Sequence, residues 1–342
     1  MATEGSVDRL QLSYRAAATK YADAARLVHA FDPDGVWGLL MEQANVLVAQ
    51  GVEFGEIGAL RDAIAIYKRC LTLAPRPKRP LDWSTTQNAL GVVLSRLAER
   101  EDAVGNFEEA IEAYNEALKE CSRERTPLDW ALTKNNIGNA LTAVGERKKD
   151  LASLESALVA YEEALEVCTR ERVPLEWANI QSNMGTTLQI IGKQEAGAER
   201  LKQAVSHFEA ALTERTRSRV PLDWAMTQNN LGNTLGLLSE QERSIDRLKA
   251  SIFCFVEALK ERTIERVPLD WAMTTTNLGL ALTRIGSLTR DVGIIEAGRD
   301  AITAALEVFE RLGAERFVVG NKRNLVGVES VLATVRNRNQ QE

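Results

Sequence analysis

Few side chains in this sequence have the types and spacing needed for acid–base or metal chemistry. Its two histidines, His29 and His207, are far apart in the chain and have no partner motif beside them. A histidine-based metal site or a Ser-His-Asp arrangement needs several such groups that converge. The sequence also has no Gly-rich phosphate loop ending in Gly-Lys-Ser or Gly-Lys-Thr. We therefore expect no catalytic site, no metal ion and no cofactor.

Carboxylates are numerous, since the chain has 48 Asp and Glu residues. Two facing carboxylic acids can hydrolyse a glycosidic bond, and a helical array can house such a pair. A catalytic pair should interrupt a repeat at one place, whereas most acids here recur with the repeat described below or lie on outward faces. The sequence thus predicts that the chain is not an enzyme.

The four cysteines are Cys70, Cys121, Cys168 and Cys254, and none forms a Cys-x-x-Cys pair. Such spacing argues against a zinc site or a redox motif. Cys121 and Cys168 occupy equivalent places in neighbouring repeats, where packed helices lie about 8 to 10 Å apart. A relaxed disulfide needs Cα atoms within roughly 7 Å. We expect reduced, buried thiols.

Asparagine is the residue type with the most concentrated hydrogen-bonding capacity, as in Asn135-Asn136 and Asn229-Asn230. Each amide offers two donor hydrogens and an acceptor oxygen. In a helix interior, asparagine is less favourable than alanine by roughly half a kcal/mol. A role in binding or in packing must offset that cost, and the elements that carry the amides decide which role is available.

Composition excludes several classes of partner. The formal charge of −6 comes from 42 basic and 48 acidic residues without long single-sign runs, so nothing marks a surface for nucleic acid. No stretch approaches the roughly 18 apolar residues of a membrane span, and residues 1–8 lack the pattern of a secretory leader. We expect a soluble, cytoplasmic protein that binds neither nucleic acid nor membrane.

A repeat of 47 residues organises the chain. Pro-Leu-Asp-Trp begins at Pro80, Pro127, Pro221 and Pro268, and Pro-Leu-Glu-Trp begins at Pro174, so five copies follow one another without an insertion. Counted from the tryptophan, apolar residues at offsets 7, 11 and 14 share one helical face with it. Proline suits a first helical turn, and an acid there faces the positive end of the helix dipole. We expect a first helix in each repeat that buries the five tryptophans, Trp83, Trp130, Trp177, Trp224 and Trp271.

A second helix follows in each repeat, with a small residue, an aromatic residue and a small residue at i, i+4 and i+7. Ala110, Tyr114 and Ala117 give one example. Small residues beside a ring let two helices approach closely while the ring fills the gap. Between the helices, Gly145 to Asp150 and Gly192 to Gly197 indicate turns.

A glycine at offset 8 of the first helix and this small–aromatic–small pattern resemble the tetratricopeptide repeat, over about residues 35–335. The asparagine-rich first helix is similar to the long-repeat versions found in kinesin light chains and in bacterial signalling proteins. The period of 47 exceeds the usual length of about 34 residues, which implies longer helices and a longer turn. The resemblance implies an all-α fold, an α-solenoid in which antiparallel helix pairs form a right-handed superhelix.

The repeat predicts four segments. Residues 1–34 form an N-terminal capping helix, because Tyr14, Tyr21 and Val28 lie on one face. Residues 35–79 form a degenerate first repeat, and residues 80–314 form five repeats of 47 residues. Residues 315–342 form a C-terminal capping helix over about 316–336, followed by a polar tail. Capping units shield the ends of a stacked array from water.

In the family that the chain resembles, the face of the first helix opposite the tryptophan lines a concave groove. We expect a protein or peptide to bind there, with Lys134 beside the amides. An equally open interpretation is that the amides bond to one another between adjacent first helices and fix the stacking. The candidate peptide-binding residues are Asn88, Lys134, Asn135, Asn136, Asn139, Asn183, Asn229, Asn230, Asn233 and Asn277.

These patterns predict an adaptor or scaffold that captures a segment of a partner protein. Two alternatives stay open. The chain could build a homo-oligomer or filament through its groove or an exposed end. It could also be a sensor or regulatory subunit of a separate signalling enzyme such as a caspase-like peptidase, since bacterial repeats resembling these are often joined to such enzymes.

Overall fold

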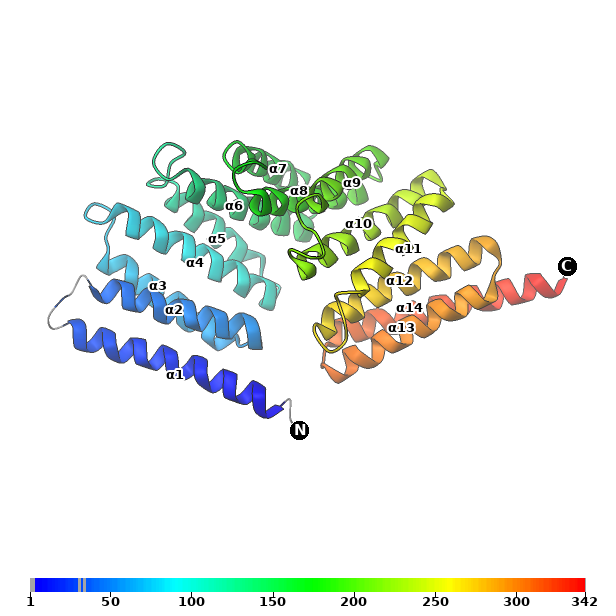
Figure 1. Cartoon of the computed structure of the whole chain (residues 1–342), viewed down its shortest axis with the longest axis horizontal. Helices are drawn as coiled ribbons and strands as arrows, with labels where there is room; N and C mark the ends of the chain where they lie inside the picture. Colours follow the sequence, from blue (N-terminus) through cyan, green and yellow to red (C-terminus); the bar gives the residue numbers. More distant parts are fainter. Residues whose placement is uncertain (1–3, 30–31, 33–34, 342) are drawn as a thin grey trace. The chain divides into compact units, whose positions relative to one another are not determined.

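The computed structural model describes residues 4–29, 32 and 35–341, and all regular secondary structure in them is α-helical (Figure 1). The chain forms two compact units, residues 1–169 and 170–342. The predicted capping segment 1–34 includes residues 1–3, 30, 31, 33 and 34, which lie outside the described residues, as does residue 342. The helices of the first unit are α1 (Glu4–His29), α2 (Gly35–Phe54), α3 (Ile57–Leu73), α4 (Pro80–Glu101), α5 (Val104–Ala117), α6 (Pro127–Lys148) and α7 (Leu151–Leu165).

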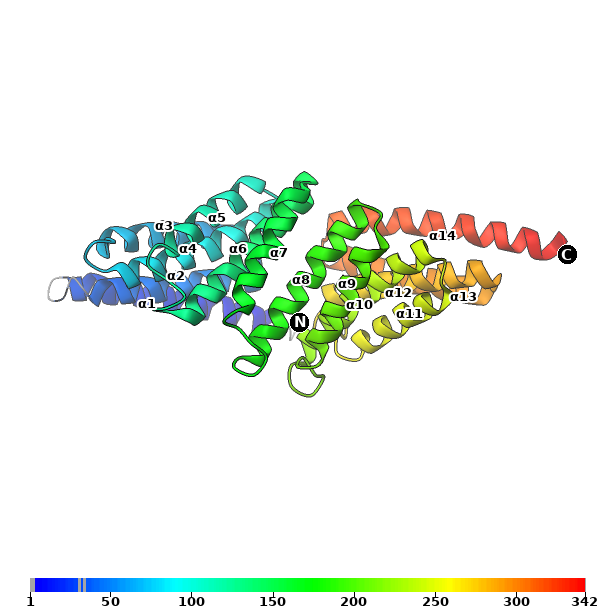
Figure 2. The ribbon, with the colours of Figure 1, turned by 90° about the horizontal axis from the view of Figure 1, so that it is seen from above.

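The second unit continues the alternation of first and second helices. Its helices are α8 (Pro174–Gln194), α9 (Ala198–Leu212), α10 (Pro221–Glu242), α11 (Ile245–Leu259), α12 (Pro268–Thr289), α13 (Val292–Arg311) and α14 (Glu315–Gln341). Inside each unit, every second helix packs against its own first helix and against the next first helix, and α14 packs against both α12 and α13 (Figures 1 and 2). The fold is therefore an α-solenoid built from helix pairs.

The first helix of each 47-residue repeat begins where the sequence predicts. α4, α6, α8, α10 and α12 each begin at the proline of the repeat, with an acidic residue in the first turn. Proline costs nothing there because its missing N–H would have no intrahelical partner. The acid stabilises the unpaired N–H groups of that turn.

The turns between the two helices of a repeat are shorter than predicted. Gly145 and Gly192 lie inside α6 and α8, not in the turns that were expected to begin with them. A Cβ on Gly145 would lie 2.6 Å from Leu154 Cγ, so glycine admits the second helix at this point. The chain then reverses through one residue with positive φ in each of five turns: Asp102, Lys149, Ala196, Arg243 and Arg290, with φ between 51° and 55°.

In the cores, large side chains of the second helices pack against glycines of the first helices. In the first unit, buried Tyr67 and Tyr114 join Leu60, Leu90 and other residues of a continuous apolar interior. In the second unit, Phe255 packs with Leu248 and Ile285, and Phe309 packs with Ala272 and Val318. Each pair of helices thus buries the stripe that the period predicts.

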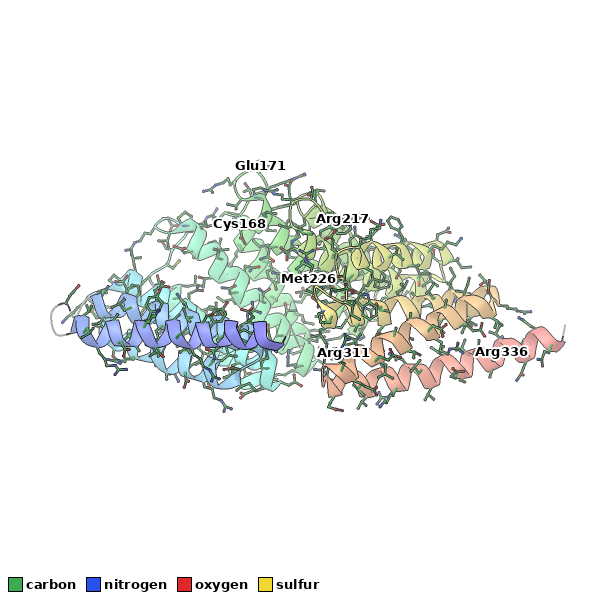
Figure 3. All side chains as sticks on the ribbon, turned by 60° about the horizontal axis from the view of Figure 1, so that its bottom comes forward. Cys168, Glu171, Arg217, Met226, Arg311 and Arg336 are labelled. Atoms are coloured by element: carbon green, nitrogen blue, oxygen red, sulfur yellow. The ribbon has the colours of Figure 1, made fainter. Side chains whose placement is uncertain are left out.

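The five tryptophans, which the sequence predicts to lie in the core, are partly buried. Cations cover the remaining faces of several of the rings. The guanidinium of Arg170 lies 5.6 Å from the ring centroid of Trp177, and that of Arg217 lies 6.0 Å from the ring of Trp224. Figure 3 labels Arg217, which comes from the turn between α9 and α10. Such cation–π contacts let an indole sit at the edge of a core.

The basic turns form an ion-pair ladder between repeats. Arg76 donates Nε to Glu120 at 2.6 Å, and Arg125 pairs with the same carboxylate at 3.8 Å. One repeat after another shows the same geometry: Arg170 with Glu214 at 2.7 Å and Arg217 with Glu261 at 2.5 Å. These ion pairs join successive turns that precede the first helices, within each unit.

The C-terminal helix is longer than predicted. α14 runs to Gln341, so residues 337–341 are helical and not a polar tail. Arg336 donates to Glu296 Oε1 at 2.5 Å, and Asn339 donates its amide to the carbonyl of Arg290 at 3.2 Å. These contacts tie the last turns of α14 to α13 and to the turn before it.

Candidate functional site

Several of the predicted amides lie between neighbouring first helices and bond there. Asn135 and Asn229 are buried, at 4% and 6% exposure. Asn277 of α12 donates its amide to Asn229 Oδ1 of α10 at 3.1 Å, and Asn229 donates to Asn230 Oδ1 at 3.3 Å. This chain of bonds links adjacent helices of the second unit. Asn229 and Asn277 therefore hold the stack together.

Two asparagines of the first unit also accept hydrogen bonds inside the fold. Thr133 of α6 donates its hydroxyl to Asn88 Oδ1 of α4 at 3.2 Å. Tyr161, whose ring is buried in the core, donates its hydroxyl to Asn139 Oδ1 at 2.8 Å. Each amide keeps its NH₂ group for other contacts, because only the oxygen is used in these two bonds.

Lys134 contacts two residues of its own repeat. Its ammonium lies 2.7 Å from Glu163 of α7 and 5.7 Å from the ring centroid of Trp130. A lysine held by a carboxylate and a ring is a weak candidate for binding an acidic ligand. The structure thus places Lys134 at the junction of α6 and α7.

The remaining predicted residues, Asn136, Asn183, Asn230 and Asn233, are partly exposed on the first helices. Asn136 and Asn139 line a depression of about 180 Å³ that Arg96 of α4 also lines. A second depression, of about 300 Å³, lies between α4 and α6 and includes Asn88 and Leu132. The first unit therefore offers two hollows, each lined partly by the amides.

The second unit has a larger groove between α12 and α14, of about 430 Å³. Leu280, Arg284, Arg323, Asn324 and Val331 are among its lining residues. Asn324 lies 47 residues after Asn277 and continues the register of Asn136, Asn183 and Asn230. Asn324 is not among the predicted binding residues because the last helix was expected to be a cap, yet the period itself points to that residue.

Two buried arginines lie one repeat apart in the second unit. Arg215 donates to Thr227 Oγ1 and to Asn179 Oδ1, both at 3.0 Å, and Arg262 donates to Thr274 Oγ1 at 3.0 Å. Burial lowers the pKa of both guanidinium groups from the usual value, although arginine stays charged in proteins. Cys121 and Cys168 occupy the equivalent positions of the first unit.

None of the four cysteines is in a disulfide, and all four are buried, as the sequence predicts. Burial raises the pKa of Cys70 to about 11 and that of Cys254 to about 12. A thiol is nucleophilic only as a thiolate. These two cysteines are therefore unreactive near neutral pH.

Within the described residues, no three side chains of the His, Cys, Asp and Glu types come together in a way that could hold a metal ion. None of the helices in that part of the chain has the length and apolar character to cross a membrane. The ring of His207 is partly buried, and its Nδ1 lies 2.6 Å from Gln181 Oε1. This pair links α9 to α8 and belongs to the packing of that repeat.

A tetratricopeptide-repeat family model matches residues 83–120 and 130–170, which begin at Trp83 and Trp130. No curated protein matches the sequence. Among solved structures, the chain is similar to BtubC (BKLC) from P. vanneervenii, with 23% identity and a TM-score of 0.53 over 75% of this chain and 92% of that one. It is also similar to a chain of the APC/C hetero-tetramer Cut9-Hcn1, with 13% identity and a TM-score of 0.52 over 89% of this chain and 46% of that one. The matched model shows tetratricopeptide repeats in residues 83–120 and 130–170, and the two solved structures share the helical-repeat fold of the chain.

Proposed function

We propose that the chain is a protein-interaction scaffold that holds a peptide or protein segment against the exposed face of its first helices. The observation that carries this proposal is the partial exposure of asparagines on the first helices, as at Asn136 and Asn233, with Asn136 lining a depression of the first unit. A row of amides can bind the main chain of a ligand at regular intervals. A regulatory subunit of a separate enzyme would be one case of such a scaffold.

The contacts divide the predicted residues by role. Asn88, Asn139, Asn229 and Asn277 accept or donate bonds inside the fold, which supports the stacking interpretation for them. The side-chain amides of Asn136 and Asn233 make no hydrogen bond within the part of the chain that the structure describes. We assign these two the binding role, because a helix gains nothing from an unpaired asparagine.

Affinity capture followed by mass spectrometry tests the assignment. The bait is the full chain in three forms: the parent, the double variant Asn136→Ala/Asn233→Ala, and the control Glu112→Ala/Lys249→Ala, which changes exposed residues of two second helices. We expect the parent and the control to capture the same proteins and the asparagine variant to lose them. Identical captured sets from all three folded baits would contradict the proposal.

Light scattering over a range of concentrations separates this function from self-association. A scaffold for another protein should keep one molar mass as its concentration rises. Mass growth without any partner would instead favour the assembly of copies of this chain.

A further inference from the structure

The groove between α12 and α14 has an apolar lining that is exposed to solvent. Leu280 and Leu288 of α12 are 40% and 57% exposed, partly buried Val331 of α14 lies beside them, and Val328, 2% exposed, forms the floor. Leucine side chains on a surface are common singly, but a hollow that gathers several of them marks an interaction site.

The period shows that this apolar lining is a local feature and not a requirement of the fold. None of the four earlier repeats has a leucine at the position equivalent to Leu280 or to Leu288. The position of Leu280 is taken by Val92, Asn139, Thr186 and Asn233 in earlier repeats, and that of Leu288 by Arg100, Arg147, Gln194 and Gln241. Seven of these eight residues are polar, so the stack does not require a leucine at either position.

The polar part of the lining is basic. Arg284 bonds to Glu240 of α10, whereas Arg323 is exposed and has no ion-pair partner in the part of the chain that the structure describes. The side-chain amide of Asn324 beside it makes no hydrogen bond to any described residue. No acidic residue lines the groove. The groove therefore complements a ligand that is apolar and negatively charged.

We propose that the α12–α14 groove binds a segment of a partner protein in which aliphatic or aromatic side chains stand next to a carboxylate. The apolar side chains contact Leu280, Leu288 and Val331, and the carboxylate accepts paired N–H bonds from Arg323. The amide of Asn324 binds the main chain of the segment. This inference rests on the proposed scaffold function and names one site and one class of ligand for it.

A selection from displayed random peptides of about 12 residues, an interface length that fits a short docking segment, tests the site on the full chain. Enriched peptides are synthesised with a fluorophore, and their affinity is measured by anisotropy. We expect enriched peptides to combine Leu, Ile or Phe with Asp or Glu. Leu280→Asn, which installs the residue of the preceding repeat, should weaken binding at least about tenfold, and so should Arg323→Glu.

Variants of the first unit test whether the peptides bind in the α12–α14 groove or elsewhere. Arg96→Glu changes the residue of the first 47-residue repeat that corresponds to Arg284, and Glu112→Ala changes an exposed residue of α5 in the same unit. We expect Asn324→Ala to weaken peptide binding and the two variants of the first unit to leave it unchanged. Thermal melts of all variants show that they remain folded.

Three results would overturn the inference. Enriched peptides without acidic residues would remove the role of Arg323. Peptides that tolerate Leu280→Asn and Arg323→Glu but lose affinity with Asn136→Ala would place binding in the first unit, so the scaffold function would stand while this site fails. If no peptide is enriched and no protein is captured, both the site and the scaffold function fail.

Discussion

The ring of Tyr161 lies directly over the Cα of Gly138, so that a Cβ on Gly138 would meet the ring carbons at 2.5 to 2.8 Å. Gly91 with Tyr114, Gly185 with Phe208 and Gly232 with Phe255 show the same relationship. The glycine at offset 8 is therefore a contact surface for the aromatic residue 23 positions later. It fixes how closely the two helices of a repeat approach.

Gly138→Ala should destabilise the chain despite the better helix propensity of alanine. Alanine gains roughly 1 kcal/mol in a helix, but overpacking against a ring that cannot move costs about 1 to 3 kcal/mol, and Tyr161 is buried. Urea unfolding measures the difference. Gly320→Ala in α14, where no atom lies within 4 Å of the added carbon, is the control and should stabilise by about 0.5 to 1 kcal/mol. Equal effects of the two changes would contradict the contact.

Arg243→Gly should stabilise the second unit. Arg243 has φ 52° in the turn between α10 and α11 and is exposed. A residue with a Cβ in this conformation costs about 1 to 2 kcal/mol, which glycine avoids, although glycine loses about 0.5 to 1 kcal/mol more entropy on folding. The net gain should be about 0.5 kcal/mol, seen as a higher urea midpoint. Lys249→Gly, inside α11, should lower the midpoint instead.

Trp177→Ala should cost about 2 to 4 kcal/mol, somewhat less than the loss of a fully enclosed tryptophan. Part of the ring faces Arg170, which also bonds to Glu214. A double-mutant cycle with Arg170→Ala isolates the contact, and a coupling of about 0.5 to 1 kcal/mol is expected. A coupling of zero would mean that the guanidinium does not rest on the ring in solution.

The stability of the second unit should decrease as the pH falls below about 6.5, the usual pKa of histidine. Burial lowers the pKa of His207 in the folded chain. The unfolded chain therefore takes up the proton more readily, so the stability that the neutral ring contributes is lost as the pH falls through the folded pKa. Urea midpoints of the parent and of His207→Gln between pH 7.5 and 5 should converge at low pH. A constant difference would show that this ring does not titrate with unfolding.

The sequence predicted the parts of the fold that depend on one repeat alone. Proline at the first helical position and the glycine-and-ring pairing both follow from spacing, and the structure confirms them at Pro127 and at Gly138 with Tyr161. The cysteines are buried and none is in a disulfide, as expected. The likeness to the long-repeat kinesin light chains stays a prediction.

Features that depend on neighbouring repeats were harder to predict. A helical wheel places Asn229 and Asn277 on one open face, but the next first helix lies close enough for Asn277 to bond to Asn229. The wheel also places Trp177 in the core, whereas Arg170 from the preceding turn covers part of the ring. No single-helix pattern contains the position of an adjacent helix, so these contacts required coordinates.

The ion-pair ladder has a consequence for how the chain can change in length. Arg170 meets Glu214 across a junction in the same way that Arg217 meets Glu261 across the next. A deletion or duplication of one whole 47-residue period would therefore bring together ends that already fit one another. Genetic recombination could shorten or lengthen such an array while every remaining junction keeps its native contacts.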